Sequence, residues 1–276
     1  MPNRIAFQGE SGAYSELAAR KYFGESFTSL PLTNFKSVFE ALHSGEAEAA
    51  VIPIENSLAG SIHENYDWLL HYRLPIIGEI ILRISHCLLA LPGVTLSEIR
   101  RIISHPQALQ QCREFLESWP SIAVEPAYDT AGSARRIRTE ELHDTAAIAS
   151  LEAAQKYQLA VLAKAIESNH QNYTRFLVLA REERTSEAAN RTTIVFSCRE
   201  APGALFKALA VFALRDLNLL KIESRPLHGM PFNYYFYLDF EGSLADEPVR
   251  NALAHLREIT TFLQVLGSYP KGPAIE

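Results

Sequence analysis

The sequence is poor in cysteine, and the placement of its few cysteines excludes two kinds of protein. Cys87, Cys112 and Cys198 lie far apart, and no two of them form a Cys-x-x-Cys pair. An odd number at these spacings indicates neither a disulfide framework nor a thiolate metal site. We therefore expect three reduced thiols and no metal centre.

The chain also lacks an excess of basic charge and a long apolar run. Its formal net charge is -6, its pI is about 5.9, and its lysines and arginines form no clustered run. Binding to a nucleic-acid backbone needs a basic surface, so we predict no nucleic-acid partner. No uncharged apolar run approaches the ~20 residues that cross a bilayer, and the first strand begins near Arg4 without a signal-peptide layout. We expect a cytoplasmic protein with no membrane partner.

Apolar residues are present in sufficient number for two cores. Of the 276 residues, 47% are hydrophobic, and single cores rarely grow beyond roughly 250 residues. Up to residue 181, short β-rich runs alternate with helical patterns, which is typical of an α/β domain with a mostly parallel sheet. Phe35, Phe39 and Leu42 recur at helical spacing, and Pro106 is placed to open another helix. The predicted strands are 5–7, 49–54, 76–82, 101–104, 146–149 and 176–180.

A different order of elements follows a polar stretch, which we interpret as a linker over residues 182–189 because it has too few apolar groups to pack. From 190 to 276 the order is strand, helix, strand, strand, helix, strand. This order predicts a ferredoxin-like βαββαβ unit with both helices on one face of an antiparallel sheet. In the third of these strands, Phe232, Tyr234 and Phe236 alternate with Tyr235 and Tyr237. We predict that the first set lies in the core and that the opposite, aromatic face marks a subunit contact.

Motifs along nearly the whole chain carry a resemblance to a known family. Pro202-Gly203-Ala204-Leu205 and Glu223-Ser224-Arg225-Pro226 resemble the phenylalanine-binding ACT domain attached to prephenate dehydratases. Upstream segments match the same family in its order. They are Phe7-Gln8-Gly9, Gly12-Ala13-Tyr14-Ser15-Glu16, Pro53-Ile54-Glu55-Asn56-Ser57, Ser104-His105-Pro106-Gln107-Ala108 and Asn172-Tyr173-Thr174-Arg175-Phe176.

The resemblance implies a fold class. The fold would be α/β, with a two-lobed catalytic domain of the type II periplasmic-binding-protein kind over residues 1–181, followed by an ACT regulatory domain over 190–276. Lobe one would comprise about 1–77 plus 174–181, and lobe two about 78–172. The active site would lie in the cleft between the lobes, and Asn172 to Phe176 would form the return crossing.

The resemblance also implies an activity. Prephenate dehydratases convert prephenate to phenylpyruvate in L-phenylalanine biosynthesis, with loss of water and carbon dioxide and without a cofactor. Ala59 stands where the family often has Glu, and the run 56–67 is similar to plant arogenate dehydratases. Arogenate, which would give L-phenylalanine directly, is therefore the alternative substrate. A non-catalytic amino-acid sensor is the alternative of another class, and the intact motif around Thr174 argues against it.

The family places its essential threonine at the position of Thr174. Because the pKa of an alcohol is too high for a conventional acid near neutral pH, we expect Thr174 to hydrogen-bond the leaving hydroxyl or to relay a proton to it. Arg175 could pair with a substrate carboxylate, but neighbours on a regular strand point to opposite faces, so a structural ion pair is the alternative. Phe176 is expected to contact the substrate as well.

The substrate is a dianion and the chain is net acidic, so the attraction between them must be local. Three predicted helix N-termini could supply unpaired backbone N–H groups, although ordinary N-capping is the alternative for each. The residues expected to contact the substrate there are Ser11, Gly12, Ala13, Ser104 and Thr130. Asn56 and Ser57 are expected to contact it too, with a turn-forming Asn56 as the alternative. His105 is a candidate proton source or a helix cap.

The resemblance finally implies a regulatory site for L-phenylalanine between paired ACT domains. A glycine turn before a helix exposes backbone N–H groups to a carboxylate, and Glu223 could meet an ammonium group. The expected effector-binding residues are Pro202, Gly203, Ala204, Leu205, Glu223, Ser224, Arg225 and Pro226. The expected partners are prephenate or arogenate, L-phenylalanine, and further copies of the chain in a homodimer or homotetramer.

Overall fold

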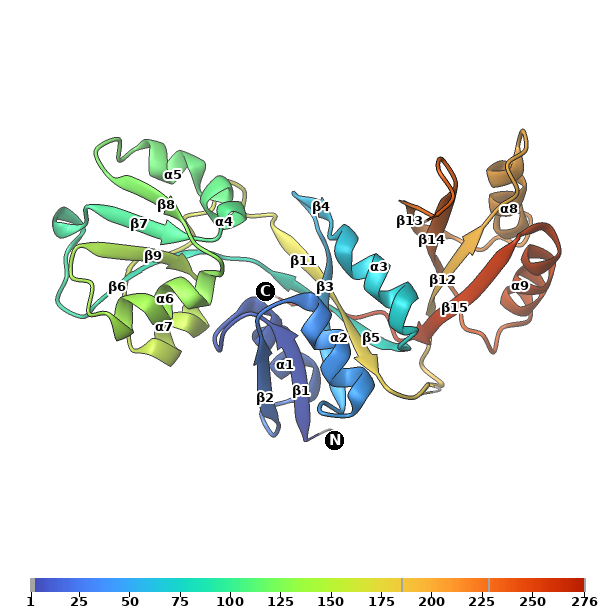
Figure 1. Cartoon of the computed structure of the whole chain (residues 1–276), viewed down its shortest axis with the longest axis horizontal. Coiled ribbons are helices and arrows are strands. Elements are labelled where there is room, and N and C mark those ends of the chain that lie inside the picture. Colours follow the sequence, from blue (N-terminus) through green and yellow to red (C-terminus); the bar gives the residue numbers. More distant parts are fainter. Residues whose placement is uncertain (1–2, 185, 228, 276) are drawn as a thin grey trace.

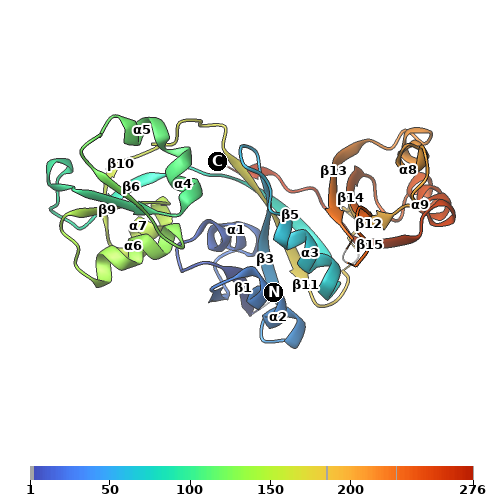
Figure 2. The same ribbon diagram turned by 45° about the horizontal axis from the view of Figure 1, so that its top comes forward.

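A computed structural model describes residues 3–184, 186–227 and 229–275, and Thr185 of the predicted linker lies outside the described residues. Three sheets, each with its own helices, lie in a row (Figure 1), and the turned view keeps them apart (Figure 2). Two of them form lobes joined by crossing strands, and the third follows in the sequence. The predicted fold class, a two-lobed α/β part and a ferredoxin-like unit, is confirmed.

Lobe one is the central unit and contains a mixed sheet. Its strand order is β16-β5-β11-β3-β1-β2, with β4 beside β3, and β11 runs antiparallel to both β3 and β5. Helix α2 follows directly from the sequence: Asn34 accepts from the Ser37 N–H at its start, Phe39 and Leu42 are buried, and Gly45 ends it in the left-handed conformation. The elements of this unit are β1 (Arg4–Gln8), α1 (Tyr14–Phe23), β2 (Thr28–Leu32), α2 (Phe35–Ser44), β3 (Ala49–Asn56), β4 (Gly60–Ser61), α3 (His63–Tyr72), β5 (Ile76–Arg83), β11 (Tyr173–Ala180) and β16 (Ala274–Ile275).

Lobe two has a five-stranded sheet with the order β10-β6-β9-β7-β8. β7 is parallel to β8 and β9, whereas β6 is antiparallel to its neighbours. Helix α4 begins at Pro106, as predicted, and the His105 side chain accepts from the Gln107 N–H at its start. The elements are β6 (Cys87–Ala90), η1 (Leu96–Glu98), β7 (Arg101–Ser104), α4 (Pro106–Gln111), α5 (Arg113–Glu117), β8 (Ala123–Pro126), α6 (Thr130–Thr139), β9 (Thr145–Ala149), α7 (Leu151–Tyr157) and β10 (Ala160–Ala163).

Two chain segments connect the lobes. β5 stays paired with β11 up to Arg83, and the chain enters lobe two before β6 begins at Cys87. It returns at Tyr173, the first residue of β11. The outward crossing therefore lies later than the predicted boundary near residue 78, because β5 keeps its hydrogen-bonding partner along its whole length.

The third unit has the sheet order β13-β14-β12-β15, with all pairs antiparallel. Residues of α8 and α9 share one apolar core with this sheet, which is the predicted ferredoxin-like order. The elements are β12 (Arg191–Ser197), α8 (Ala204–Ala213), β13 (Leu219–Pro226), β14 (Tyr234–Glu241), α9 (Glu247–Ile259) and β15 (Phe262–Tyr269).

One face of the third unit differs from the prediction. Phe232, predicted in the core, precedes β14 and is 85% exposed. Tyr237, predicted on a face for subunit contact, is buried against lobe one of the same chain, where its ring lies 4.9 Å from that of Tyr66 and its hydroxyl donates to the Tyr66 carbonyl at 2.7 Å. The aromatic face is therefore a contact between units within one chain.

The end of the chain returns to lobe one. β16 pairs in parallel with β5, so the range 190–276 predicted for the third unit includes a strand of the first sheet. In the part of the chain that the structure describes, no helix is both long and apolar enough to span a bilayer.

Candidate active site

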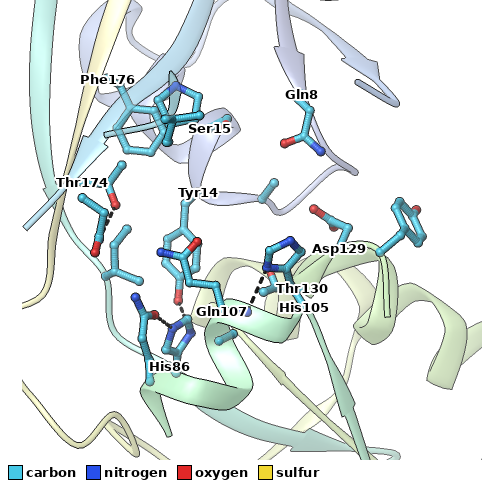
Figure 3. Close-up of a pocket in the computed structure, with 18 of the residues that line it drawn as sticks. Gln8, Tyr14, Ser15, His86, His105, Gln107, Asp129, Thr130, Thr174 and Phe176 are labelled. Atoms are coloured by element: carbon cyan, nitrogen blue, oxygen red, sulfur yellow. Dashed lines mark hydrogen bonds between the residues drawn. The ribbon is translucent and has the colours of Figure 1, made fainter. Parts of the chain in front are cut away.

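A cavity of about 360 Å³ lies between the two lobes. Figure 3 shows Thr174 and Phe176 on one side of it, and His105, Asp129 and Thr130 across from them. The lining residues from lobe one are Gln8, Ala13, Tyr14, Ser15, Phe35, Pro53, Asn56, Ile62, Thr174 and Phe176, and those from the outward crossing and lobe two are Ile84, His86, His105, Gln107, Ala108, Gln111, Tyr128, Asp129 and Thr130.

Strand β11 carries two of these residues on the same face. Thr174 and Phe176 are two positions apart, so both line the cavity, whereas Arg175 between them does not. β11 is central in its sheet, with β3 on one side and β5 on the other. The Thr174 side chain is therefore held on a rigid element.

Asn56 fixes the direction of a hydrogen bond to Thr174. The Asn56 Oδ1 atom accepts from the N–H groups of Leu58 and Ala59, at 3.0 and 2.9 Å, so the other end of its amide must be the NH₂ group. This nitrogen has two hydrogens to donate, and it lies 2.7 Å from Asn172 Oδ1, 3.0 Å from Thr174 Oγ1 and 3.1 Å from the Tyr173 carbonyl oxygen. Thr174 is thus an acceptor for Asn56, and its own hydroxyl hydrogen is available to a ligand.

No lysine or arginine is among the described lining residues of the cavity, so the cavity must attract an anion by other means. Ala13 lies at the N-terminal end of α1, and Thr130 is the first residue of α6. Helix N-termini attract negative charge through the helix dipole and unpaired N–H groups. Neutral side chains that can donate hydrogen bonds also line the cavity, namely Gln8, Ser15, Asn56, Gln107 and Gln111.

His86 lies in a chain of polar groups at the cavity wall. Its Nδ1 atom is 3.0 Å from the Tyr14 hydroxyl, and its Nε2 atom is 2.9 Å from the Gln111 amide. Burial lowers the pKa of His86 despite its contact with Gln111, and burial also raises the pKa of the Tyr14 phenol well above its usual value. Both groups are therefore neutral at pH 7 and serve as hydrogen-bonding groups.

The opposite wall carries His105 and Asp129. Burial lowers the pKa of His105, and its Nδ1 atom accepts from the Gln107 N–H at 3.2 Å, so the neutral ring can donate from Nε2. Asp129 caps α6 by accepting from the Gly132 N–H at 2.6 Å, and burial raises the pKa of its carboxyl group. In the described residues, no group of three or more His, Cys, Asp and Glu side chains is arranged to hold a metal ion.

A family model described as prephenate dehydratase matches residues 5–184, which include the residues that line the cavity and both lobes apart from β16 and the first strand residue. The chain belongs to the prephenate dehydratase family. This confirms the resemblance drawn from the motifs around Asn56 and Thr174.

Individual relatives agree with the family assignment. An arogenate dehydratase/prephenate dehydratase 2 of Arabidopsis thaliana is 52% identical over 97% of this chain and 72% of its own length. A crystal structure of prephenate dehydratase in complex with L-Phe from Arthrobacter aurescens is 35% identical, with a TM-score of 0.88 over 97% of this chain and 90% of that one. A structure of GqqA, described as a novel type of quorum quenching acylase, is 36% identical, with a TM-score of 0.89 over 98% and 99% of the two chains.

Several residues expected to contact the substrate do not line the cavity in this member of the family. The Ser104 hydroxyl donates to the Ile148 carbonyl at 2.6 Å. Ser57 Oγ accepts from the N–H of Tyr173, the first residue of β11, at 2.9 Å. Ser11 and Gly12 use their carbonyl groups to bind lobe two, where Tyr157 and Ser150 donate to them. These residues position the walls of the cavity, whereas Ala13, Asn56, Thr130, Thr174 and Phe176 line it.

Arg175 lies on the face of β11 opposite the cavity. Its guanidinium group contacts Glu79 at 2.7 Å, Asp239 at 2.6 Å and Glu55 at 3.1 Å, and Asp239 belongs to the third unit. Burial alone would lower its pKa, but the surrounding carboxylates hold it well above the usual value. Direct contact with substrate does not fit this geometry, and the alternative of a structural ion pair does, because strand alternation separates Arg175 from Thr174.

The two predicted effector motifs lie in different surroundings. Pro202 and Gly203 are exposed before α8, followed by the partly buried Ala204 and Leu205. In the second motif, Ser224 and Pro226 are exposed, whereas Glu223 and Arg225 face lobe one. There Glu223 accepts from Ser61, and Arg225 pairs with Asp67 at 2.6 Å. An ammonium group would have to compete with Ser61 for Glu223.

Several lining residues were not singled out from the sequence. Gln8, Tyr14 and Gln107 lie within motifs that matched the family, and the motif context was the available signal for them. His86 and Gln111 lie outside every motif noted, on the outward crossing and at the end of α4. The two residues are 25 positions apart in the sequence, and the fold brings His86 Nε2 to 2.9 Å from the Gln111 amide oxygen.

Proposed function

We propose that this chain catalyses the decarboxylating dehydration of prephenate to phenylpyruvate, a step in L-phenylalanine biosynthesis. The observation that carries the proposal is Thr174, which faces a cavity between two lobes with its hydroxyl hydrogen free to be donated. The membership of the chain in the prephenate dehydratase family supports it.

The reaction breaks two bonds of the substrate ring. The electron pair of the bond to the ring carboxylate moves into the ring as carbon dioxide leaves, and the bond to the ring hydroxyl breaks at the opposite carbon. The departing oxygen takes up a proton and leaves as water. Aromatisation supplies the driving force, so the protein needs to bind, orient and stabilise rather than supply a strong acid.

Thr174 would donate its hydroxyl hydrogen to the departing oxygen. Asn56 supports this role because it donates to Thr174 Oγ1, which leaves the Thr174 hydrogen as the free end of the pair. The final proton would come from solvent or from a neighbouring donor through Thr174. General acid assistance of this kind is typically worth about 10²–10⁴ in rate.

The two carboxylates of the substrate would be held differently. The N-terminal ends of α1 and α6 and neutral amides such as Gln107 suit the carboxylate that stays. Pro53, Ile84 and Phe176 give the cavity apolar wall, and a carboxylate placed there is poorly solvated. Poor solvation favours its departure as neutral carbon dioxide.

Arogenate is the second candidate substrate. It is favoured by 49% identity to an arogenate dehydratase of Petunia hybrida, whereas the Arabidopsis thaliana relative at 52% identity is named for both activities. Arogenate carries an amino group where prephenate has a keto oxygen. Discrimination would depend on the few cavity groups that meet this side chain.

We further propose that L-phenylalanine regulates the enzyme through the third unit. The related structure from Arthrobacter aurescens was determined with L-Phe bound, and the third unit carries the motif residues 202–205 and 223–226. We also propose that the chain assembles as a homodimer or homotetramer and that it is located in the cytoplasm.

The test is turnover of the two substrates side by side. We expect phenylpyruvate from prephenate, measured by absorbance in alkali, and L-phenylalanine from arogenate if that substrate is accepted. The ratio of the two kcat/KM values then assigns the preferred substrate. Absence of product from both would contradict the proposal and favour the amino-acid sensor.

A further inference from the structure

Two neighbouring residue pairs on β3 and β11 face in opposite directions. Thr174 lies opposite Asn56 in the register of the two strands, and Arg175 lies opposite Glu55. The first pair lines the cavity. The second carries opposite charges that meet at 3.1 Å on the other face of the sheet.

Arg175 is bound by both lobe one and the third unit. Its Nε donates to Glu79 of β5 at 2.7 Å, its Nη1 to Asp239 of β14 at 2.6 Å and its Nη2 to the Tyr269 hydroxyl of β15 at 3.1 Å. A guanidinium group is planar and its donors have fixed directions. Its orientation is therefore determined by two units at once.

A second arginine contacts two of the same buried carboxylates. Arg191 of β12 donates to Glu79 at 3.1 Å and to Asp239 at 2.8 Å. Arg175, Arg191 and Asp239 are each 5% exposed and Glu79 is 1% exposed, so two positive and two negative charges are paired out of water. We call these four residues and Tyr269 the interface cluster. Displacing one charged member leaves an excess of one buried charge among the others, which is costly, so we expect the cluster to move as a unit.

Glu55 has its own connection to the third unit. Its Oε2 atom lies 2.6 Å from Lys221 Nζ on β13, and Lys221 also donates to Ser61 at 2.9 Å. Lys221 precedes the motif residue Glu223 by two positions, so both side chains leave the same face of β13. Both neighbours of the Thr174–Asn56 pair, Arg175 and Glu55, are thus bound by the third unit.

We propose that Arg175 and Glu55 are positioning residues, through which the third unit sets the placement of Thr174 and Asn56 in the cavity. This inference rests on the proposed function. When L-phenylalanine changes the position of the third unit relative to lobe one, the interface cluster and the Lys221–Glu55 pair shift β11 and β3 at the residues next to the catalytic pair. Regulation then travels through a continuous set of buried contacts within one chain.

Two buried tyrosines allow a matched test. The Tyr269 hydroxyl contacts Arg175, whereas the Tyr237 hydroxyl donates to the Tyr66 carbonyl at the same interface without touching the cluster. In Tyr269→Phe we expect kcat to fall severalfold with KM within twofold of wild type. The L-phenylalanine concentration for half-inhibition should rise at least fivefold, since typical couplings correspond to 5- to 150-fold effects. Tyr237→Phe should match wild type in both measurements.

Calorimetry of L-phenylalanine binding in the absence of substrate shows whether a variant has lost effector binding itself or only the coupling between effector binding and catalysis. Tyr269→Phe should keep the wild-type Kd, because the substitution removes the connection and leaves the motif residues intact. Lys221→Met is the second variant, since Lys221 is partly exposed and its loss perturbs the core less than a cluster residue would. It should also weaken inhibition while the protein still turns over substrate.

The outcomes distinguish this inference from the proposed function. A wild-type enzyme that forms no product from either substrate would refute the proposed function. Wild-type turnover and inhibition, with both Tyr269→Phe and Lys221→Met indistinguishable from Tyr237→Phe, would refute the positioning role alone. Loss of inhibition accompanied by loss of L-phenylalanine binding would assign the residues to the effector site instead and would overturn the inference as well.

Discussion

At the scale of single residues, the orientation of Asn56 is what gives Thr174 its role. Two backbone N–H groups hold Oδ1 of the amide, so its NH₂ end must face Thr174. A hydroxyl that accepts one hydrogen bond is polarised to donate another. The pair is therefore a directed donor chain that ends in the cavity.

This direction can be tested with Asn56→Asp. The carboxylate can still accept from Leu58 and Ala59, so the turn after β3 is retained, but it cannot donate to Thr174. A hydrogen bond between neutral groups is worth about 0.5–1.5 kcal/mol, so kcat/KM should fall by roughly 2- to 13-fold. Steady-state kinetics measure the loss, and an unchanged thermal unfolding midpoint would show that the fold is intact. Wild-type kinetics in the variant would exclude the directed pair.

The sequence could predict part of this site for physical reasons. The motif indicated Thr174 and Asn56. For Arg175, strand alternation left a structural ion pair as the alternative to the expected contact with substrate. The hydroxyl groups of Ser57 and Ser104 could not be assigned in this way, because each binds a backbone group that is distant in the sequence. A serine that caps or bridges has the same local pattern as one that binds a ligand.

At the scale of elements, the loop after β1 meets helix α6 across the cleft. Glu10 accepts from the Tyr128 hydroxyl at 2.5 Å and from Arg135 Nη1 at 2.8 Å. Arg136, the next residue of α6, pairs instead with Glu140 one turn along the same helix. One arginine therefore joins the lobes and its neighbour does not.

The two arginines form a matched pair of variants. Arg135→Gln should raise KM by up to about fivefold with kcat unchanged, because it removes the ion pair with Glu10 that joins the two lobes. A partly exposed ion pair of this kind is worth at most about 1 kcal/mol. Arg136→Gln should leave both constants at wild-type values. Equal effects of Arg135→Gln and Arg136→Gln on KM would show that the contact between Arg135 and Glu10 does not contribute to substrate binding.

Most strands with continuous apolar runs could be predicted, whereas the short strand β6 and the edge strands of the two lobes could not. β3 and β9 are fully or almost fully buried and stand out in the sequence. β8 is exposed along its whole length, β2 contains Pro31, and β16 has two residues. Edge strands lack a second neighbour and carry few apolar residues, so their patterns resemble loops.

At the scale of the whole molecule, the third unit is attached to lobe one by buried charges. The sequence did not indicate this attachment, because charged residues such as Arg191 and Asp239 on half-apolar strands have the same local pattern whether their face meets solvent or another unit. Only the packing of the third sheet on lobe one buries them. Gly267 permits the approach, since a Cβ atom there would lie 2.2 Å from the Ile76 carbonyl oxygen.

The stability of the molecule should depend on Asp239 and on pH. Burial alone would raise the pKa of Asp239, but Arg175 and Arg191 hold it below its usual value. A lowered folded-state pKa gives stability that is present above the unfolded value of about 3.9 and is lost as pH falls through the folded value. Asp239→Asn should therefore lose about 3–5 kcal/mol of unfolding free energy at pH 7, and the gap to wild type should narrow below about pH 4.

Asp67→Asn is the control for this measurement by urea denaturation. Asp67 pairs with Arg225 at the partly exposed rim of the same interface, so its loss should cost no more than about 1 kcal/mol. Equal costs for the two variants at pH 7 would contradict the assignment of the buried charges as the main attachment.

The central claim is that the hydroxyl of Thr174 assists the departure of the ring hydroxyl, and Thr174→Val tests it most directly. Valine keeps the shape and the β-propensity of the residue but removes the hydroxyl. Turnover of prephenate or arogenate should fall by about 10²–10⁴, while Thr174→Ser keeps part of it. Full turnover in the valine variant would contradict the account.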